Sequence, residues 1–141
     1  MSQTDKKPLT IVNPPGLYDP SPYGYSHLAL VAPGSRLIFV AGQGGETLDG
    51  TMAPDFRAQV RQAFANLRTA LQGAGATFAD VAKLTVLIVD HSEERLGMFG
   101  AEMAASWGDT GLKPTCTLIP VPRLALDAML VEIEATAVLP A

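Results

Sequence analysis

The feature of this sequence that most constrains its fold is a pair of short segments that are apolar on both faces of a β-strand. Residues 84–89 read Leu-Thr-Val-Leu-Ile-Val, and residues 37–40 read Leu-Ile-Phe-Val. Neighbouring residues of a strand point to opposite faces of its sheet, so strands that are apolar at almost every position need cover on both faces. The sheet of this protein therefore needs an apolar layer on each side.

Two predicted helices supply one of those layers. Within residues 54–71 and 92–107, apolar side chains recur at steps of three and four, which is the spacing of one helix face. The residues that form the two apolar faces are Phe56, Val60, Phe64, Leu67 and Leu71, and Leu96, Phe99, Met103 and Trp107. Besides residues 84–89, strands are predicted over residues 27–32, 36–41, 115–119 and 128–138.

The order of these elements predicts an α+β fold in which both helices pack on one face of the sheet. The first two strands are separated only by Pro33-Gly34-Ser35, and this spacing predicts a β-hairpin. Because two helices cover only one face, we expect the other face to be buried against another copy of the chain. The alternative is a monomer in which the proline-rich segment 13–25 and the loops cover that face.

Length and composition limit the class of protein. The chain has 141 residues, which fits a single domain; we place that domain at residues 13–141 and expect residues 1–12 to be a flexible N-terminal segment. The hydrophobic share of 48% excludes general disorder. The single cysteine, Cys116, excludes an internal disulfide and a multi-cysteine metal site.

Charge and hydropathy patterning argue against two kinds of partner. The net charge of −4 has the wrong sign for a protein that binds nucleic acid phosphates. No apolar run reaches the roughly 18 residues that a membrane span needs. The polar start of the chain lacks the apolar core of a signal peptide, so we expect a cytoplasmic protein.

Two candidate catalytic groups stand out. Glu132 and Glu134 share one face of the last predicted strand, where they could act as a general base and its neighbour; the alternative is a solvated sheet face. A catalytic Cys116 would need a base, and nothing in the sequence brings His27 or His91 close to it. A buried, inert cysteine is therefore the default interpretation.

Two further segments could bind a ligand. The sequence Gly42-Gln43-Gly44-Gly45 follows a strand but lacks the lysine and the helix of a phosphate-binding loop. We interpret it as a tight turn whose exposed amide N–H groups could bind a carboxylate. Arg123, in the loop after residue 121, is the arginine near the C-terminal strands that could reach an anionic ligand; the alternative is a solvated arginine.

Several short motifs, taken in order, resemble the reactive-intermediate deaminase family, also called Rid or YjgF. The resemblance spans about residues 13–138 and includes Asn13-Pro14-Pro15-Gly16, Tyr25-Ser26-His27, Phe39-Val40-Ala41-Gly42-Gln43 and Val131-Glu132-Ile133-Glu134-Ala135. It implies a chorismate-mutase-like α+β fold with a mixed sheet, assembled as a homotrimer with three ligand clefts between subunits. Active members hydrolyse enamines and imines, such as 2-aminoacrylate, to a 2-keto acid and ammonia, with no metal and no bound cofactor.

The resemblance also assigns roles to particular residues. It implies that Glu132 positions the attacking water, that Tyr25 lines the cleft, and that Gly42 and Gln43 form the glycine turn. In the family an arginine in a Pro-Ala-Arg-Ser/Thr motif clamps the substrate carboxylate, but here Cys116 stands in its place. The family's second-helix asparagine is replaced as well, by Phe99 or Gly100.

The missing arginine bears directly on activity. A charge-assisted hydrogen bond to a carboxylate contributes roughly 1.5–3 kcal/mol, so its loss argues against the standard 2-imino acid deaminase activity. Two hypotheses remain. One is a hydrolase of a small imine, enamine or related C–N compound at an inter-subunit cleft, in which Glu132 orients water, amides near Gly42 hold the polar end, and Cys116 lines the pocket or reacts within it. The other is a non-catalytic trimeric protein that binds a small metabolite or regulates a partner.

Overall fold

The computed structural model describes residues 7–109 and 111–141. Its elements in chain order are β1 (Leu9–Val12), the 3-10 helix η2 (Ser21–Tyr23), β2 (Leu28–Val31), β3 (Arg36–Gln43), α1 (Phe56–Gly73), the 3-10 helix η3 (Phe78–Asp80), β4 (Val81–Val89), α2 (Glu93–Trp107), β5 (Thr115–Val121) and β6 (Val131–Leu139). Both predicted helices are present. No helix in this described part of the chain is long and apolar enough to cross a membrane.

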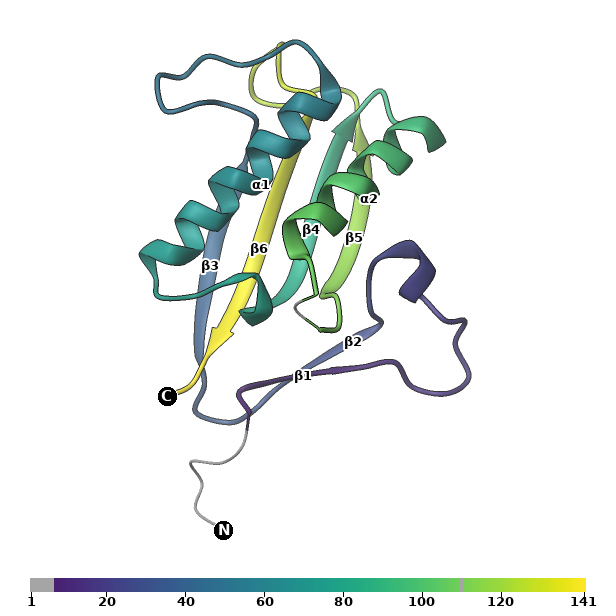
Figure 1. The fold of residues 1–141 in the computed structure, drawn as a ribbon, viewed down its shortest axis with the longest axis vertical. Coiled ribbons are helices and arrows are strands. Elements are labelled where there is room, and N and C mark those ends of the chain that lie inside the picture. Colours follow the sequence, from purple (N-terminus) through teal and green to yellow (C-terminus); the bar gives the residue numbers. More distant parts are fainter. Residues whose placement is uncertain (1–6, 110) are drawn as a thin grey trace.

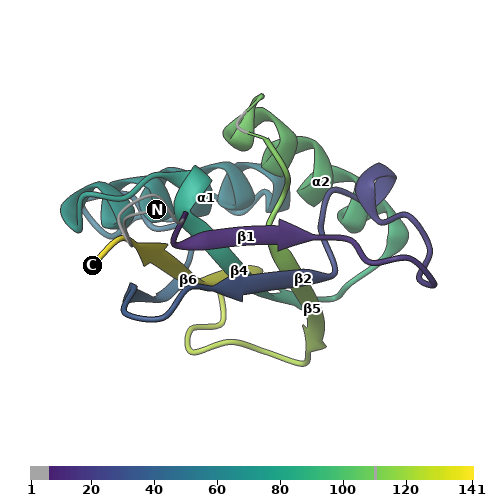
Figure 2. The same cartoon turned by 90° about the horizontal axis from the view of Figure 1, so that it is seen from below.

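Four strands form the main sheet, in the order β3-β6-β4-β5. Strand β6 runs antiparallel to both β3 and β4, whereas β5 runs parallel to β4. Both helices lie on the same face of this sheet (Figure 1), and the view from below shows them as one layer above the strands (Figure 2). The structure confirms the predicted α+β fold with a mixed sheet and two helices on one face.

The core lies between the helices and the inward-facing side chains of the central strands. The predicted apolar face of α1 is buried, and alternate residues of β4 and β6 pack against it. The side chains with no exposed surface include Val60, Leu67, Leu84, Val86, Ile88, Val131 and Ile133. Removing this apolar surface from water holds the helices to the sheet.

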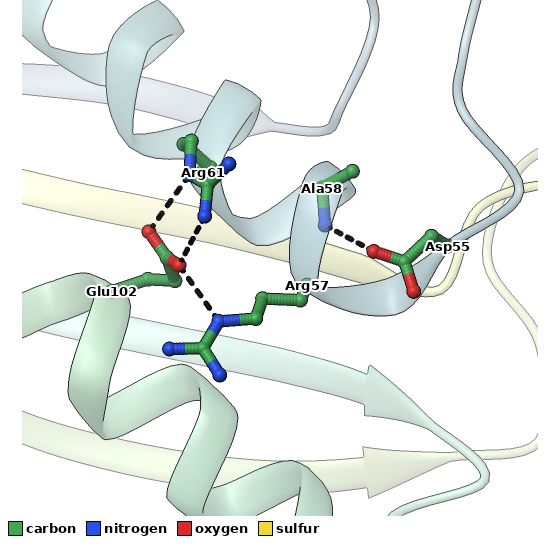
Figure 3. Close-up of polar contacts among 5 residues, drawn as sticks. All are labelled: Asp55, Arg57, Ala58, Arg61 and Glu102. Atoms are coloured by element: carbon green, nitrogen blue, oxygen red, sulfur yellow. Dashed lines mark hydrogen bonds and ion pairs between the residues drawn. The ribbon is translucent and has the colours of Figure 1, made fainter.

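An ion-pair cluster around the buried Glu102 joins the two helices (Figure 3). Glu102 of α2 accepts hydrogen bonds from Arg61 of α1 through both carboxylate oxygens, from Nη2 at 2.8 Å and from Nε at 3.2 Å. Arg57 Nε donates to the same carboxylate at 2.9 Å. The hydrogen bonds from Arg61 are the main cause that lowers the pKa of Glu102 below its usual value, against the opposing effect of burial. This cluster fixes α2 relative to α1.

The predicted β-hairpin between residues 27–32 and 36–41 is wrong. Strand β2 pairs antiparallel with β1, and β3 pairs instead with β6, in a different sheet. The spacing at Pro33-Gly34-Ser35 does allow the chain to reverse. However, β3 pairs with β6 from Arg36 to Gln43 and puts Val40 into the core, and these long-range contacts prevail over the local pairing.

The prediction of a flexible segment over residues 1–12 also needs correction. Residues 9–12 form strand β1, whose register with β2 runs from Leu9 opposite Val31 to Val12 opposite Leu28. The physical reason is that the otherwise unpaired backbone of β2 offers hydrogen bonds to this apolar stretch. Residues 1–6 lie outside the described residues.

The sheet face opposite the helices carries exposed apolar side chains. Phe39 is 78% exposed and Leu37 is 51% exposed, and Ile119 of β5 is exposed as well. The proline-rich segment does not cover this face, because residues 18–25 line a cavity on the helix side instead. A single chain therefore leaves Phe39, on the second face of the sheet, without the apolar cover that the sequence predicts.

Candidate functional site

A β-bulge in β3 brings Gly42 against Glu132. Val40 lies opposite Ala135 and Gln43 lies opposite Ile133, so β3 has one more residue than β6 between these two pairs. An added Cβ on Gly42 would lie 2.6 Å from Cδ of Glu132 and closer still to Oε1. In the position that this carboxylate takes, a side chain at residue 42 would overlap it, and glycine removes that overlap.

Glu132 lies on the open face of the sheet, with apolar neighbours. Its register partner on β4 is Leu87, and the partner of Leu87 on β5 is Ile119. Among the described residues, no side chain or backbone group donates a hydrogen bond to the Glu132 carboxylate. A half-buried, unpaired carboxylate in such surroundings can accept a proton from a water molecule or orient that water toward an electrophile.

Side-chain amides of α1 hydrogen-bond the backbone of the turn after β3 and of the residues just before β6, the two strands that meet at this carboxylate. Asn66 Nδ2 donates to the carbonyl oxygens of Gly44 and Glu46, at 2.9 and 2.8 Å, and so holds the turn after the bulge. Buried Gln59 donates to Ala128 O at 2.9 Å and accepts from Leu130 N at 2.9 Å, just before β6 begins. The sequence analysis did not predict that Asn66 and Gln59 hold this backbone. The sequence signal for such a role is that each is a polar residue within an amphipathic helix.

The side chain of Gln43 hydrogen-bonds the backbone of the bulge. Its Nε2 donates to Ala41 O at 3.0 Å, so the side chain folds back on its own strand. The predicted glycine turn at Gly42-Gln43 is therefore a bulge closed by a side-chain hydrogen bond, and the backbone around Gly42 is the part that lies beside Glu132.

A cavity of about 970 Å³ lies on the other side of the sheet, against α2. Segment 18–25, α2 and the start of β5 enclose it, and its lining includes Tyr25, Cys116 and Lys113. Ser26 N donates to Pro114 O at 3.0 Å, which places Tyr25 beside the first residues of β5. The volume is within the range of cavities that bind small molecules.

The tyrosines of this cavity pack edge to face around His27. The ring centroid of His27 lies 5.2 Å from that of Tyr18 and 5.6 Å from that of Tyr25, with nearly perpendicular ring planes. A ring nitrogen of His27 also hydrogen-bonds Tyr18 O at 2.9 Å. Such pairs stabilise a fixed arrangement of aromatic edges, so this wall of the cavity is preformed.

Cys116 faces the cavity as an uncharged thiol. Burial raises its pKa to about 11, so the thiolate is a minor form near neutral pH. Within the described chain, neither His27 nor His91 makes a hydrogen bond to this sulfur. This environment suits a side chain that lines a pocket better than a nucleophile.

The predicted site residues fall into two groups on opposite faces of the sheet. Glu132 and Gly42 lie on the open face, whereas Cys116 and Tyr25 lie on the helix side. Cys116 pairs with Leu84, whose partner on β6 is Ala135, a residue of the helix-covered core. One chain therefore does not bring Tyr25, Cys116 and Glu132 together.

Arg123 belongs to neither group. It lies in the exposed loop after β5, where its Nη2 pairs with Asp127 Oδ1 at 2.6 Å, and it does not line the cavity. Its charge is already paired within that loop. The structure therefore supports the solvated alternative for Arg123.

These features define an α+β protein with a bulge glycine beside a strand glutamate. The family model described as endoribonuclease L-PSP matches residues 20–139, which is most of the chain. The chain belongs to this family, the Rid or YjgF family that the sequence motifs resemble.

Individual relatives agree with this assignment. The chain is 32% identical to the RutC family protein PH0854 of Pyrococcus horikoshii over 124 residues, which is 84% of this chain and 90% of that protein. It is 47% identical to the RutC family protein YjgH of Escherichia coli K12 over 58 residues, which is 41% of this chain and 44% of that protein. The crystal structure of the Rid family protein YyfB from Yersinia pestis superposes with a TM-score of 0.88 at 35% identity, and covers 94% of this chain and 100% of that one.

Proposed function

We propose that this chain is a hydrolase of a small imine, enamine or related C–N compound, and that it acts at clefts between the subunits of a homotrimer. The observation that carries the proposal is the unpaired carboxylate of Glu132, which the bulge at Gly42 admits beside Leu87 on the open face of the sheet. The expected cytoplasmic location stays a prediction from sequence.

The subunit arrangement follows from the two separated groups of residues. The open face needs an apolar cover over Phe39 and Leu37, and a second copy of the chain supplies one. In this arrangement, Cys116 and Tyr25 of one chain lie near Glu132 of the neighbouring chain. The site then takes its carboxylate from one chain and its cavity from the next.

The chemistry needs one water molecule and no bound cofactor. Glu132 accepts a proton from the water as its oxygen bonds to the imine carbon, and the C=N electron pair moves to nitrogen. The proton held by Glu132 then passes to that nitrogen, which gives a carbinolamine. Glu132 next takes the hydroxyl proton of the carbinolamine and passes it to the nitrogen, while the oxygen electron pair forms C=O and the C–N bond breaks, so that the products are a carbonyl compound and ammonia or an amine. Backbone groups that the bulge leaves unpaired can bind the polar end of the substrate.

The matched pair Glu132→Gln and Glu134→Gln tests this proposal. Both glutamates lie on the same face of β6, but only Glu132 lies against Gly42. With imines generated in situ from amines, ammonia release should fall by about 10²- to 10⁴-fold in Glu132→Gln and stay near wild type in Glu134→Gln. Sedimentation should show that both variants assemble as the wild type does. Unchanged turnover in Glu132→Gln would refute the proposed role.

The second candidate is a non-catalytic trimeric protein that binds a small metabolite. Cys116 favours it, because a protonated thiol without a base stands where the resemblance implies a substrate-clamping arginine. Ligand binding without turnover of any imine or enamine would support this second candidate. Ribonuclease activity is not proposed, because the net charge of −4 opposes phosphate binding.

A further inference from the structure

The cavity against α2 is nearly without charge. Among the described residues that line it there is no aspartate, glutamate, arginine or histidine, and Lys113 is the one cationic side chain. The ammonium group of Lys113 donates to Gly108 O at 3.0 Å, at the C-terminal end of α2. The negative end of that helix therefore engages the charge of Lys113.

Helix α2 leaves space on the side that faces the cavity. Gly97 and Gly100, three residues apart and so on one face of the helix, both line it. An added Cβ at either position would meet no atom within 4 Å beyond its immediate neighbours. Glycine within a helix is less stable than alanine, and nothing in the described chain fills the space that these glycines leave.

The remaining walls favour an apolar occupant. Cys116 is an uncharged thiol, and Met103 and Leu118 lie beside it along the cavity. An aromatic group that enters leaves water and meets the ring edges of Tyr18 and Tyr25. A carboxylate that enters loses its hydration, and Lys113, the one cation among the described lining residues, already donates to Gly108 O at the end of α2.

We propose that this cavity binds a neutral apolar or aromatic group of the substrate, so that the chain acts on imines or enamines that carry no carboxylate. This substrate class rests on the hydrolase function proposed above. It differs from the 2-imino acids that the family resemblance implies, since those are held by their carboxylate.

A matched pair of small probes tests the polarity of the cavity. 4-Fluorobenzamide and 4-fluorobenzoate have nearly the same shape and differ in charge, and ¹⁹F NMR titration measures the affinity of each. We expect 4-fluorobenzamide to bind the wild type roughly tenfold or more tightly than 4-fluorobenzoate. Equal binding of the two, tighter binding of the benzoate, or binding of neither would overturn the proposal.

Two substitutions at Gly100 locate the binding. Gly100→Leu fills the space beside α2 and should abolish binding of 4-fluorobenzamide, whereas Gly100→Ala should keep it. Both replace glycine by a better helix former, so thermal unfolding should show no loss of stability in either. Binding that survives Gly100→Leu in a folded protein would place the probe elsewhere and overturn the proposal. Cys116→Arg should reverse the preference toward the benzoate.

Turnover separates this inference from the proposed function. If the wild type hydrolyses carboxylate-bearing imines faster than neutral ones, the hydrolase function stands and the inferred substrate class fails. If it binds the neutral probe selectively and hydrolyses no imine, the hydrolase function fails and the polarity of the cavity stands.

Discussion

The carboxylate of Glu132 occupies the volume that a side chain at position 42 would need. An added Cβ on Gly42 would lie 2.6 Å from Cδ of Glu132, and the glycine comes from a bulge in the strand that pairs with β6. Backbone and carboxylate thus approach each other more closely than two ordinary residues of neighbouring strands can. The position of the Glu132 carboxylate therefore depends on the residue opposite it.

Gly42→Ala should displace that carboxylate and lower kcat/KM for imine hydrolysis by about 10²-fold, because a displacement of the order of 1 Å has such an effect at a reacting centre. Steady-state kinetics measures the loss. In a Glu132→Gln background the same substitution should cause little further loss, since the group it moves is already inactive. Gly73→Ala, where an added Cβ meets no atom, is the control. Full activity in Gly42→Ala would contradict the proposed role of this contact.

Phe39→Glu should prevent assembly, because it places a charge in the apolar contact that we propose between chains. Sedimentation equilibrium at micromolar protein should give three times the chain mass for the wild type and the mass of one chain for the variant. Leu48→Glu is the control, since Leu48 is fully exposed in the loop after β3 and belongs to no strand of the sheet. A wild type that sediments as a single chain would exclude the shared cleft.

Cys116→Arg should raise the deamination of 2-aminoacrylate by about ten- to a hundredfold, since it restores a charge-assisted partner for the substrate carboxylate. The substitution points into the cavity, where there is room for a longer side chain. Cys116→Ser, which changes the side chain but adds no charge, should give no gain. A folded Cys116→Arg protein without the activity would mean that the arginine is not the only difference from active family members.

Glu102→Gln should lower the free energy of unfolding at pH 7 by about 1–2 kcal/mol, a value reduced for the solvent exposure of its two arginine partners. Folding lowers the pKa of Glu102 through Arg61 and, more weakly, Arg57. The ionised carboxylate therefore stabilises the fold above its usual pKa of 4.5, and this stabilisation is lost as the pH falls through the lowered pKa.

Urea unfolding at pH 7 and pH 3 measures this contribution. The difference in stability between wild type and Glu102→Gln should be largest at pH 7 and should shrink at pH 3. A difference that does not change with pH would show that the carboxylate acts by its shape and not by its charge.

The layers of the fold could be predicted because each is encoded locally. The period of apolar residues marks α1 and α2, and the segment 84–89 of β4, apolar at all positions but Thr85, requires cover on both faces. The same reasoning failed for β2 and β3, which are neighbours in sequence but belong to different sheets. Strand β2 pairs with β1 and β3 pairs with β6 because these pairings bury apolar side chains and satisfy backbone hydrogen bonds between segments distant in sequence. A short turn sequence between β2 and β3 does not show which of the possible pairings is the most stable.

Sequence by itself determined the family and the helix-covered sheet, because these depend on residue order and spacing alone; the family resemblance also implies an arginine at the position of Cys116. Only the tertiary structure decided that Gly42 is a bulge residue against Glu132, that Arg123 is paired with Asp127, and that Cys116 faces away from Glu132. The physical reason is that strand register and bulges set which side chains share a face, and register is fixed by packing between segments distant in the chain.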